Sequence, residues 1–137
     1  MVGSEADLCG GISPQTARLL ADAGVVAIDV GGLEGTSWAK VEALRARDGR
    51  AQRLGMAFRN WGIPTEKSLL LCRAELPAVP MIASGGIRSG IDSAKALALS
   101  ADLVGMALPL LAPATHSARA VTEGSRNTSK NCAWRCS

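Results

Sequence analysis

Short apolar runs alternate with helix-like segments along most of the chain. Three runs are mostly apolar, which is typical of strands buried on both faces: residues 25–30, 79–83 and 101–107. Apolar residues recur at helical spacing in four further segments: residues 14–23, 38–47, 65–76 and 91–99. Because parallel strands need crossover connections, which are usually helices, this order predicts an α/β fold with a parallel sheet.

Local signals set the ends of the helices. Ser13 followed by Pro14 predicts an N-cap and a first helical residue, and Gly24 is expected to end that helix. Thr65 is the expected N-cap of the third helix.

Two segments fit neither period. Residues 48–60 predict a long surface loop. Residues 113–137 are mostly polar, and we expect them to form a disordered tail behind a folded body of residues 1–112.

Composition and charge exclude several classes of protein. Aromatic residues make up 3% of the chain, which argues against all-β sandwiches and against stacking platforms for single-stranded nucleic acid. The net charge of +3 comes from residues 113–137, where four basic residues face Glu123 alone. The neutral body therefore predicts no nucleic-acid partner.

The chain also shows no feature of a membrane or secreted protein. It has no run of 18 apolar residues, and its first residues do not have the pattern of a signal peptide. The four cysteines form no C-x-x-C pair, and we expect reduced thiols in a cytoplasmic protein. Cys132 and Cys136 are interpreted as incidental because no further metal ligands accompany them.

The strongest chemical signal lies in SGGIRSG, residues 84–90, between a strand and a helix. Gly85 and Gly86 have no Cβ, so their N–H groups can approach an anion closely. The N-terminus of the next helix points to the same place, and Arg88 can bind a phosphate oxygen. A phosphate site and a simple tight turn with a solvated Arg88 are equally compatible with these residues.

A second glycine loop, residues 31–37, follows the first strand. Thr36 and Ser37 offer hydroxyl groups at its end, although an N-cap role for the next helix explains them equally well. Asp29 is favoured as a hydrogen-bonded structural carboxylate. Trp38 and Trp61 are interpreted as packing residues, and the tail histidine, His116, as solvated.

Four stretches together resemble the C-terminal half of the type 2 isopentenyl diphosphate isomerases, the FMN-dependent class. They cover roughly residues 10–112 in the family's order and spacing: GISPQTARLLADAGVVAIDVGG, EGTSWAKVEALRAR, WGIPTEKSLL and IASGGIRSGIDSAKALALSADLVGMALPLL. The last stretch is also similar to the flavin phosphate region of FMN-dependent hydroxy-acid dehydrogenases. GTSW and WGIPT point to the isomerase.

The resemblance implies the second half of a (βα)₈ barrel, with residues 1–112 as a partial FMN-binding domain. Members of the family interconvert isopentenyl and dimethylallyl diphosphate with reduced FMN and Mg²⁺, and NADPH is also implied. The residues that the resemblance places around FMN are Thr36 in the first loop, Gly85, Gly86, Ile87 and Arg88 in the second, and Ala107 and Leu108 after the last strand.

The chain departs from the family at several positions. Glu34 stands in a loop that is otherwise glycine-rich, and its carboxylate should repel an anion. Leu108 replaces a common basic residue, and Ala6 lies near the position of a flavin-contacting lysine. The family's catalytic glutamine and metal-binding glutamate belong to the first half of the barrel, so no catalytic or metal residue is assigned here.

We therefore expect a fragment that is inactive alone, and that self-associates or pairs with a missing N-terminal half. Two alternatives remain: an FMN-dependent oxidoreductase of the hydroxy-acid type and a non-catalytic remnant. Hydroxy-acid oxidoreductases usually bring a histidine base from this half, and His116 in the tail argues against that class.

Overall fold

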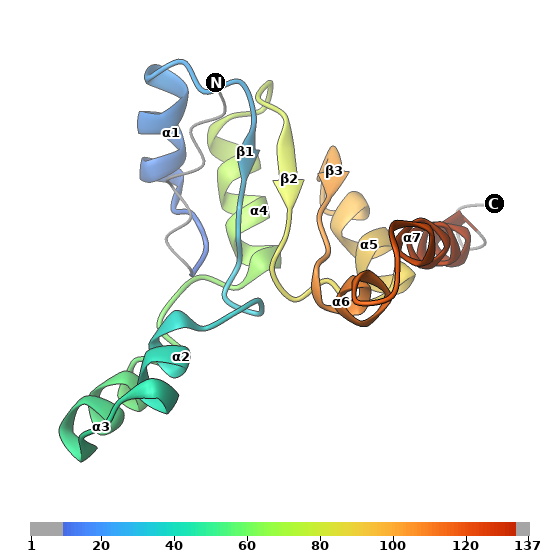
Figure 1. The fold of residues 1–137 in the computed structure, drawn as a ribbon. Coiled ribbons are helices and arrows are strands. Elements are labelled where there is room, and N and C mark those ends of the chain that lie inside the picture. The colour runs from blue at the N-terminus through green and yellow to red at the C-terminus, as the bar shows by residue number, and fades with distance from the viewer. Residues whose placement is uncertain (1–9, 134–137) are drawn as a thin grey trace.

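The computed structural model describes residues 10–133, which form three short parallel strands connected by helices (Figure 1). The strands pair in the order β1-β2-β3. The elements follow one another as α1 (Pro14–Asp22), β1 (Ile28–Asp29), α2 (Trp38–Arg45), α3 (Gly49–Ala57), α4 (Thr65–Glu75), β2 (Met81–Ala83), α5 (Gly90–Ala98), β3 (Leu103–Val104), α6 (Leu108–Ala114) and α7 (Ala118–Ala133). The expected α/β fold with parallel strands is confirmed.

One face of the sheet packs on helices and the other is open. Ile28 pairs with Met81, and both side chains are buried. The neighbouring row runs from Asp29 through Ile82 to Leu103, and Leu103 is 61% exposed. Because successive side chains of a strand point to opposite faces, this row marks the uncovered face of the sheet.

The core lies between the sheet and the helices α1, α4 and α5. Its largest fully buried apolar side chains, including the Cys72 thiol, are Ile28, Val30, Leu69, Cys72 and Met81. Burial of one large aliphatic side chain of this kind contributes about 1.5–3 kcal/mol to folding. The strands are shorter than the apolar runs that predicted them, since regular pairing covers only two or three residues of each run.

The structure confirms one of the two expected helix N-caps and contradicts the other. Ser13 caps α1 as expected, because its hydroxyl oxygen accepts from the N–H of Thr16 at 3.1 Å. Thr65 is not the N-cap of α4: Pro64 holds that position, and Thr65 is the first helical residue. Its hydroxyl group bonds elsewhere, to carbonyl oxygens of the loop after β2.

The expectation of a loop over residues 48–60 is wrong, because residues Gly49–Ala57 form α3. The carboxylate of Asp48 caps this helix by accepting from the N–H groups of Arg50 and Ala51. Gly55 lets α3 cross α2 closely, since a Cβ there would lie within 2.8 Å of the Ala43 side chain. The two helices form a hairpin that projects from the body (Figure 1).

The expectation of a disordered tail is wrong for the described part of residues 113–137. The boundary expected at residue 112 falls inside α6, and α7 follows it. Half-buried positions of α7 recur at helical spacing: Ala120, Val121, Gly124 and Thr128. They are small or polar, so hydrophobicity alone did not reveal this face, which meets Leu110 and Pro113 of α6 at Gly124.

Residues 10–133 contain no helix that is both long and apolar enough to cross a membrane.

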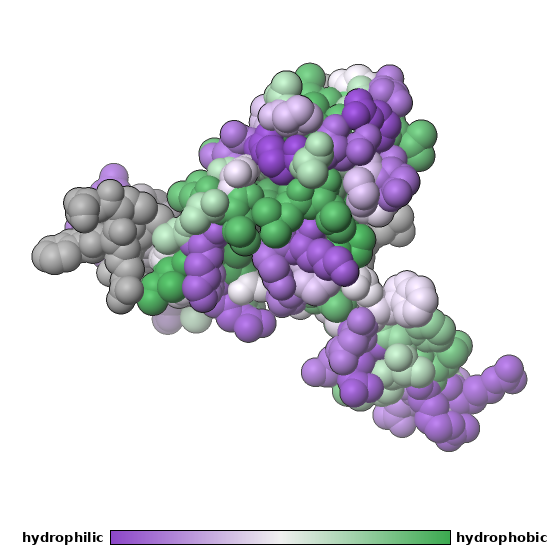
Figure 2. All heavy atoms as spheres, turned by 180° about the vertical axis from the view of Figure 1, so that it is seen from behind, coloured by the Kyte–Doolittle hydropathy of each residue, from purple (hydrophilic) through white to green (hydrophobic). Residues whose placement is uncertain are grey.

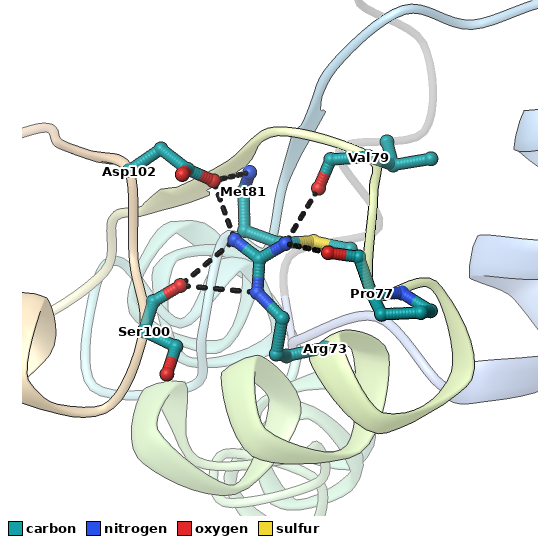
Figure 3. Close-up of polar contacts among 6 residues, drawn as sticks. All are labelled: Arg73, Pro77, Val79, Met81, Ser100 and Asp102. Atoms are coloured by element: carbon teal, nitrogen blue, oxygen red, sulfur yellow. Dashed lines mark hydrogen bonds and ion pairs between the residues drawn. The ribbon is translucent and has the colours of Figure 1, made fainter.

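The Arg73 side chain extends from α4 and bonds to the two loops that lead into β2 and β3, at the amino ends of these strands (Figure 3). Each of the five N–H groups that a guanidinium carries has an acceptor here. The acceptors are the carbonyl oxygens of Pro77, Val79 and Ser100 and the carboxylate of Asp102. The same carboxylate accepts from the N–H of Met81 at 2.7 Å, so one ion pair holds α4, β2 and β3 together.

The pKa of Asp102 is lowered, first by the N–H of Met81 and then by Arg73. A lowered pKa in the folded state stabilises the protein above the ordinary pKa of the group, and this stabilisation is lost as the pH falls through the folded value. Asp102→Asn should therefore reduce the loss of stability that sets in below about pH 5 and continues as the pH falls further. Thermal melting at each pH measures this, with Asp22→Asn on the exposed side of α1 as the matched control. An identical pH profile for Asp102→Asn and the parent chain would contradict it.

Candidate functional site

The loops that follow the three strands meet in one pocket of about 510 Å³ at the carboxyl ends of the sheet. In parallel α/β folds this edge is where ligands bind. The pocket brings together every residue that the resemblance placed around FMN: Thr36, Gly85, Gly86, Ile87, Arg88, Ala107 and Leu108.

The loop after β2 requires glycine at two successive positions. Gly85 and Gly86 have φ angles of +90° and +81°, which L side chains rarely adopt. A Cβ on Gly85 would overlap the backbone of Gly32, and one on Gly86 would overlap the side chain of Glu34. The sequence signal at these glycines therefore reflects both the turn and the close approach of the loop after β1.

This loop also presents backbone donors without acceptors. Within residues 10–133, the N–H groups of Gly85, Gly86 and Ile87 donate to no other protein group. Backbone N–H groups require a partner, either from the protein, from water or from a ligand. Adjacent N–H groups of this kind form the concave donor sites that bind anions.

The N-terminus of α5 is capped by the protein itself. The Ser89 hydroxyl oxygen accepts from the N–H of Asp92 at 3.2 Å. The Asp92 carboxylate accepts from the Ser89 hydroxyl at 2.8 Å and from the N–H of Arg88 at 3.2 Å. The Ser89 hydroxyl is the main cause of the lowered pKa of Asp92. The helix end therefore offers less to an anion than the sequence suggested, and the glycine loop offers more.

In the loop after β1, the neighbouring residues Thr36 and Ser37 have different roles. Ser37 caps α2, because its oxygen accepts from the N–H of Lys40 at 3.3 Å, and its hydroxyl donates to the carbonyl oxygen of Arg59. Thr36 stays in the pocket wall. Asp29 has the structural role that was favoured, since its carboxylate accepts from the Ser84 hydroxyl at 2.6 Å and from the N–H of Gly31.

Trp38 has a different position from the packing role that the sequence suggested. It lines the pocket and is 51% exposed, so it gives the pocket an aromatic wall. Its place directly after the pocket loop was the signal that could have identified it. Trp61 lies away from the pocket lining, where its ring meets Phe58 edge-on with a centroid distance of 5.8 Å.

Sequence reasoning also missed Thr65, and it treated Glu34 only as a source of repulsion. The Glu34 carboxylate accepts from the N–H of Thr65 at 2.7 Å. The Thr65 hydroxyl donates to the carbonyl oxygen of Gly85 at 2.6 Å, with that of Ser84 at 3.2 Å. These contacts connect the start of α4 with both glycine loops. The proline and threonine of WGIPT marked a helix start, but nothing in the sequence showed these partners.

The described residues contain no cluster of His, Cys, Asp and Glu side chains that could hold a metal ion. Cys72 is buried in the core, and burial raises the pKa of its thiol. His116 follows α6 and does not line the pocket. Ala6 and Cys9 fall outside the described residues, as do the side chains of Cys132 and Cys136.

A second pocket, of about 530 Å³, lies between α4 and α5 on the helical side of the body. Seen from that side, apolar atoms gather across the middle of the body (Figure 2). The exposed apolar side chains of these two helices are Leu70, Leu71, Ile91 and Leu97.

Comparison with known proteins identifies relatives whose sequences are similar to this one. No family model matches the chain. The chain is 57% identical over 111 residues to the isopentenyl-diphosphate delta-isomerase of Stutzerimonas stutzeri, covering 81% of this chain and 32% of that enzyme. It is 58% identical over 118 residues to the same enzyme of Methanoregula boonei, covering 81% and 32%.

A solved structure also resembles the chain. The crystal structure of GMP reductase C318A from Trypanosoma brucei, in complex with guanosine 5'-monophosphate, matches 71% of this chain and 18% of its own. The TM-score is 0.51 and the sequence identity is 29%. This match to part of a TIM-barrel enzyme agrees with the expected fold class.

The two isomerases are about three times as long as the segment that they share with this chain. The chain is therefore homologous to isopentenyl-diphosphate delta-isomerase over about a third of that enzyme's length.

Proposed function

We propose that this chain is the phosphate-binding part of a type 2, FMN-dependent isopentenyl diphosphate isomerase barrel. The observation that carries the proposal is the convergence of all seven expected residues on one pocket, with three N–H groups at its glycine loop that have no acceptor among residues 10–133. The identity to the isomerases supports the same assignment. A cytoplasmic location is part of this proposal.

The pocket has the donors that a phosphate monoester requires. The N–H groups of Gly85, Gly86 and Ile87 lie together, and Arg88 from the same loop adds a guanidinium. Hydrogen bonds between charged groups contribute about 1.5–3 kcal/mol each. FMN ends in such a phosphate group, and so does the guanosine 5'-monophosphate bound to the reductase that resembles this chain.

The other walls of the pocket suit the rest of a flavin. Trp38 offers an aromatic surface, Met106 and Leu108 are apolar, and Thr36 adds one hydroxyl. FMN, when bound in reduced form, supplies proton transfer to the isomerisation. In this proposal the chain's own residues hold and orient the cofactor, while Mg²⁺, NADPH and the diphosphate substrate are bound with residues of the remaining barrel.

The hydroxy-acid oxidoreductase alternative gains no support from the pocket. That reaction needs a base near the flavin, and no histidine lines the pocket formed by the described residues. The non-catalytic alternative differs from our proposal only if FMN fails to bind.

Arg88→Ala should weaken FMN binding by about 1–3 kcal/mol, which corresponds to roughly 5- to 150-fold in Kd. The reason is the loss of the Arg88 guanidinium from the glycine loop. Quenching of flavin fluorescence during titration measures the affinity. Arg50→Ala, at an exposed position of α3, removes the same charge and should leave the affinity unchanged. Equal affinities for Arg88→Ala and the parent chain would show that the phosphate lies elsewhere.

The isolated chain should not isomerise isopentenyl diphosphate. It matches about a third of the isomerases, and none of its residues has been assigned as an acid, a base or a metal ligand. The assay supplies reduced FMN and Mg²⁺ and follows dimethylallyl diphosphate, with the Stutzerimonas stutzeri enzyme as the positive control. Turnover well above the buffer rate would refute this prediction.

We further propose that the open face of the sheet is covered by the βα units that the isomerases carry and this match does not include. Asp29, Ile82 and Leu103 lie in one row on that face, and no described strand pairs with the outer edge of β1 or β3. Unpaired edges and exposed apolar area both favour association, the latter by about 25 cal/mol per Å². The match covers 32% of the Stutzerimonas stutzeri isomerase, and the βα units in the rest of that enzyme would fill this space.

The chain alone should therefore associate at micromolar concentration, because its strands have open edges. Co-expression with the preceding segment of the Stutzerimonas stutzeri isomerase should convert it into a one-to-one complex. Size-exclusion chromatography with light scattering measures both states. A compact monomer that unfolds cooperatively would overturn the proposal. A homo-oligomer that does not bind the co-expressed segment would exclude that segment as the partner.

A further inference from the structure

Thr65 lies where the two glycine loops meet the start of α4. Its side chain is 6% exposed, and its hydroxyl donates to the Gly85 carbonyl oxygen at 2.6 Å. The Ser84 carbonyl oxygen lies at 3.2 Å from the same hydroxyl. Both acceptors belong to the turn that leads into the free N–H groups, so the hydroxyl restrains the backbone that carries them.

The loop after β1 is held against the same residue. A Cβ on Gly32 would overlap the Thr65 hydroxyl, and the N–H of Gly32 donates to the Ser84 carbonyl oxygen at 2.9 Å. The N–H of Leu33 donates to the Ile63 carbonyl oxygen, just before α4. Three segments that are distant in sequence therefore meet at Thr65.

Glu34 also contacts Thr65, but its negative charge disfavours the binding of an anion in the pocket. Its carboxylate accepts from the N–H of Thr65 at 2.7 Å, which satisfies a donor at the start of α4. Glu34 also lines the pocket, and its Cβ lies against Gly86. The residue thus supports the loop while it places negative charge beside the expected position of an anion.

We propose that Thr65 and Glu34 together set the affinity of the pocket for phosphate. Thr65 is a positioning residue that aims the N–H groups of Gly85 and Gly86, and this strengthens binding. The charge of Glu34 weakens binding by repulsion, while its oxygen preserves the geometry. This inference rests on the proposed phosphate site, which it extends by naming residues that act on the affinity in opposite directions.

The experiment compares three variants of the whole chain by FMN titration. Thr65→Val removes the hydroxyl and keeps the shape, and binding should weaken about tenfold, the equivalent of one hydrogen bond. Thr65→Ser keeps the hydroxyl and should bind within about twofold of the parent chain. Glu34→Gln keeps an acceptor oxygen without the charge and should bind roughly fivefold more tightly.

Two further readouts separate positioning from a general loss of stability. The gain in Glu34→Gln should shrink at high salt, because salt screens charge repulsion. In the ligand-free chain, ¹⁵N relaxation order parameters of Gly85 and Gly86 should fall in Thr65→Val and not in Thr65→Ser.

Each outcome has a defined meaning. Equal loss of affinity in Thr65→Val and Thr65→Ser, or unchanged order parameters in Thr65→Val, would overturn the positioning role. Weaker binding by Glu34→Gln would overturn the role of its charge. A parent chain that does not bind FMN would refute the proposed function, while the relaxation measurement would still decide whether Thr65 holds the loop.

Discussion

The backbone of Gly32 lies against the backbone of Gly85, and the geometry of the whole pocket depends on this contact. A Cβ on Gly85 would overlap Gly32, so no larger residue fits at that position. The close approach lets the N–H of Gly32 bond to the Ser84 carbonyl oxygen and brings Thr36 and Arg88 to the same pocket. Glycine loses more conformational entropy on folding than other residues, but here only glycine allows both the positive φ angle and the close approach of the two backbones.

The two ends of the sheet differ in how their polar groups are bonded. At the carboxyl ends, the N–H groups of Gly85, Gly86 and Ile87 have no acceptor in the part of the chain that the structure describes. At the amino ends, the Arg73 guanidinium has all its N–H groups satisfied, and it connects α4 to the starts of β2 and β3 (Figure 3). In (βα) barrels ligand sites lie at the carboxyl ends of the strands and the opposite end serves stability. The unbonded donors and the fully bonded guanidinium of this chain lie at the corresponding ends.

The sequence predicted the parts of the fold in which one local signal dominates. Apolar runs located the strands, Ser13 located the start of α1, and paired glycines located the pocket loop. It failed where tertiary contacts override local pattern. The stripe on α7 consists of small and polar residues, and α3 depends on Asp48 as its cap and on Gly55 for its crossing of α2.

The candidate site shows the same limit. Gly85, Gly86 and Arg88 were identifiable because their residue types signal anion binding. Thr65 was not, because its partners are backbone carbonyl groups that lie 19 and 20 residues away in sequence. Local pattern contains no information on which backbone atoms a buried hydroxyl will meet.

The most direct test of the phosphate site is an amide NMR titration of the ¹⁵N-labelled chain with FMN. We predict that the amide resonances of Gly85, Gly86 and Ile87 shift most, because their N–H groups gain an acceptor. Shifts centred instead on residues that line only the pocket between α4 and α5, such as Glu66, Lys95 and Leu99, or no saturable shift of the Gly85, Gly86 and Ile87 resonances, would contradict it.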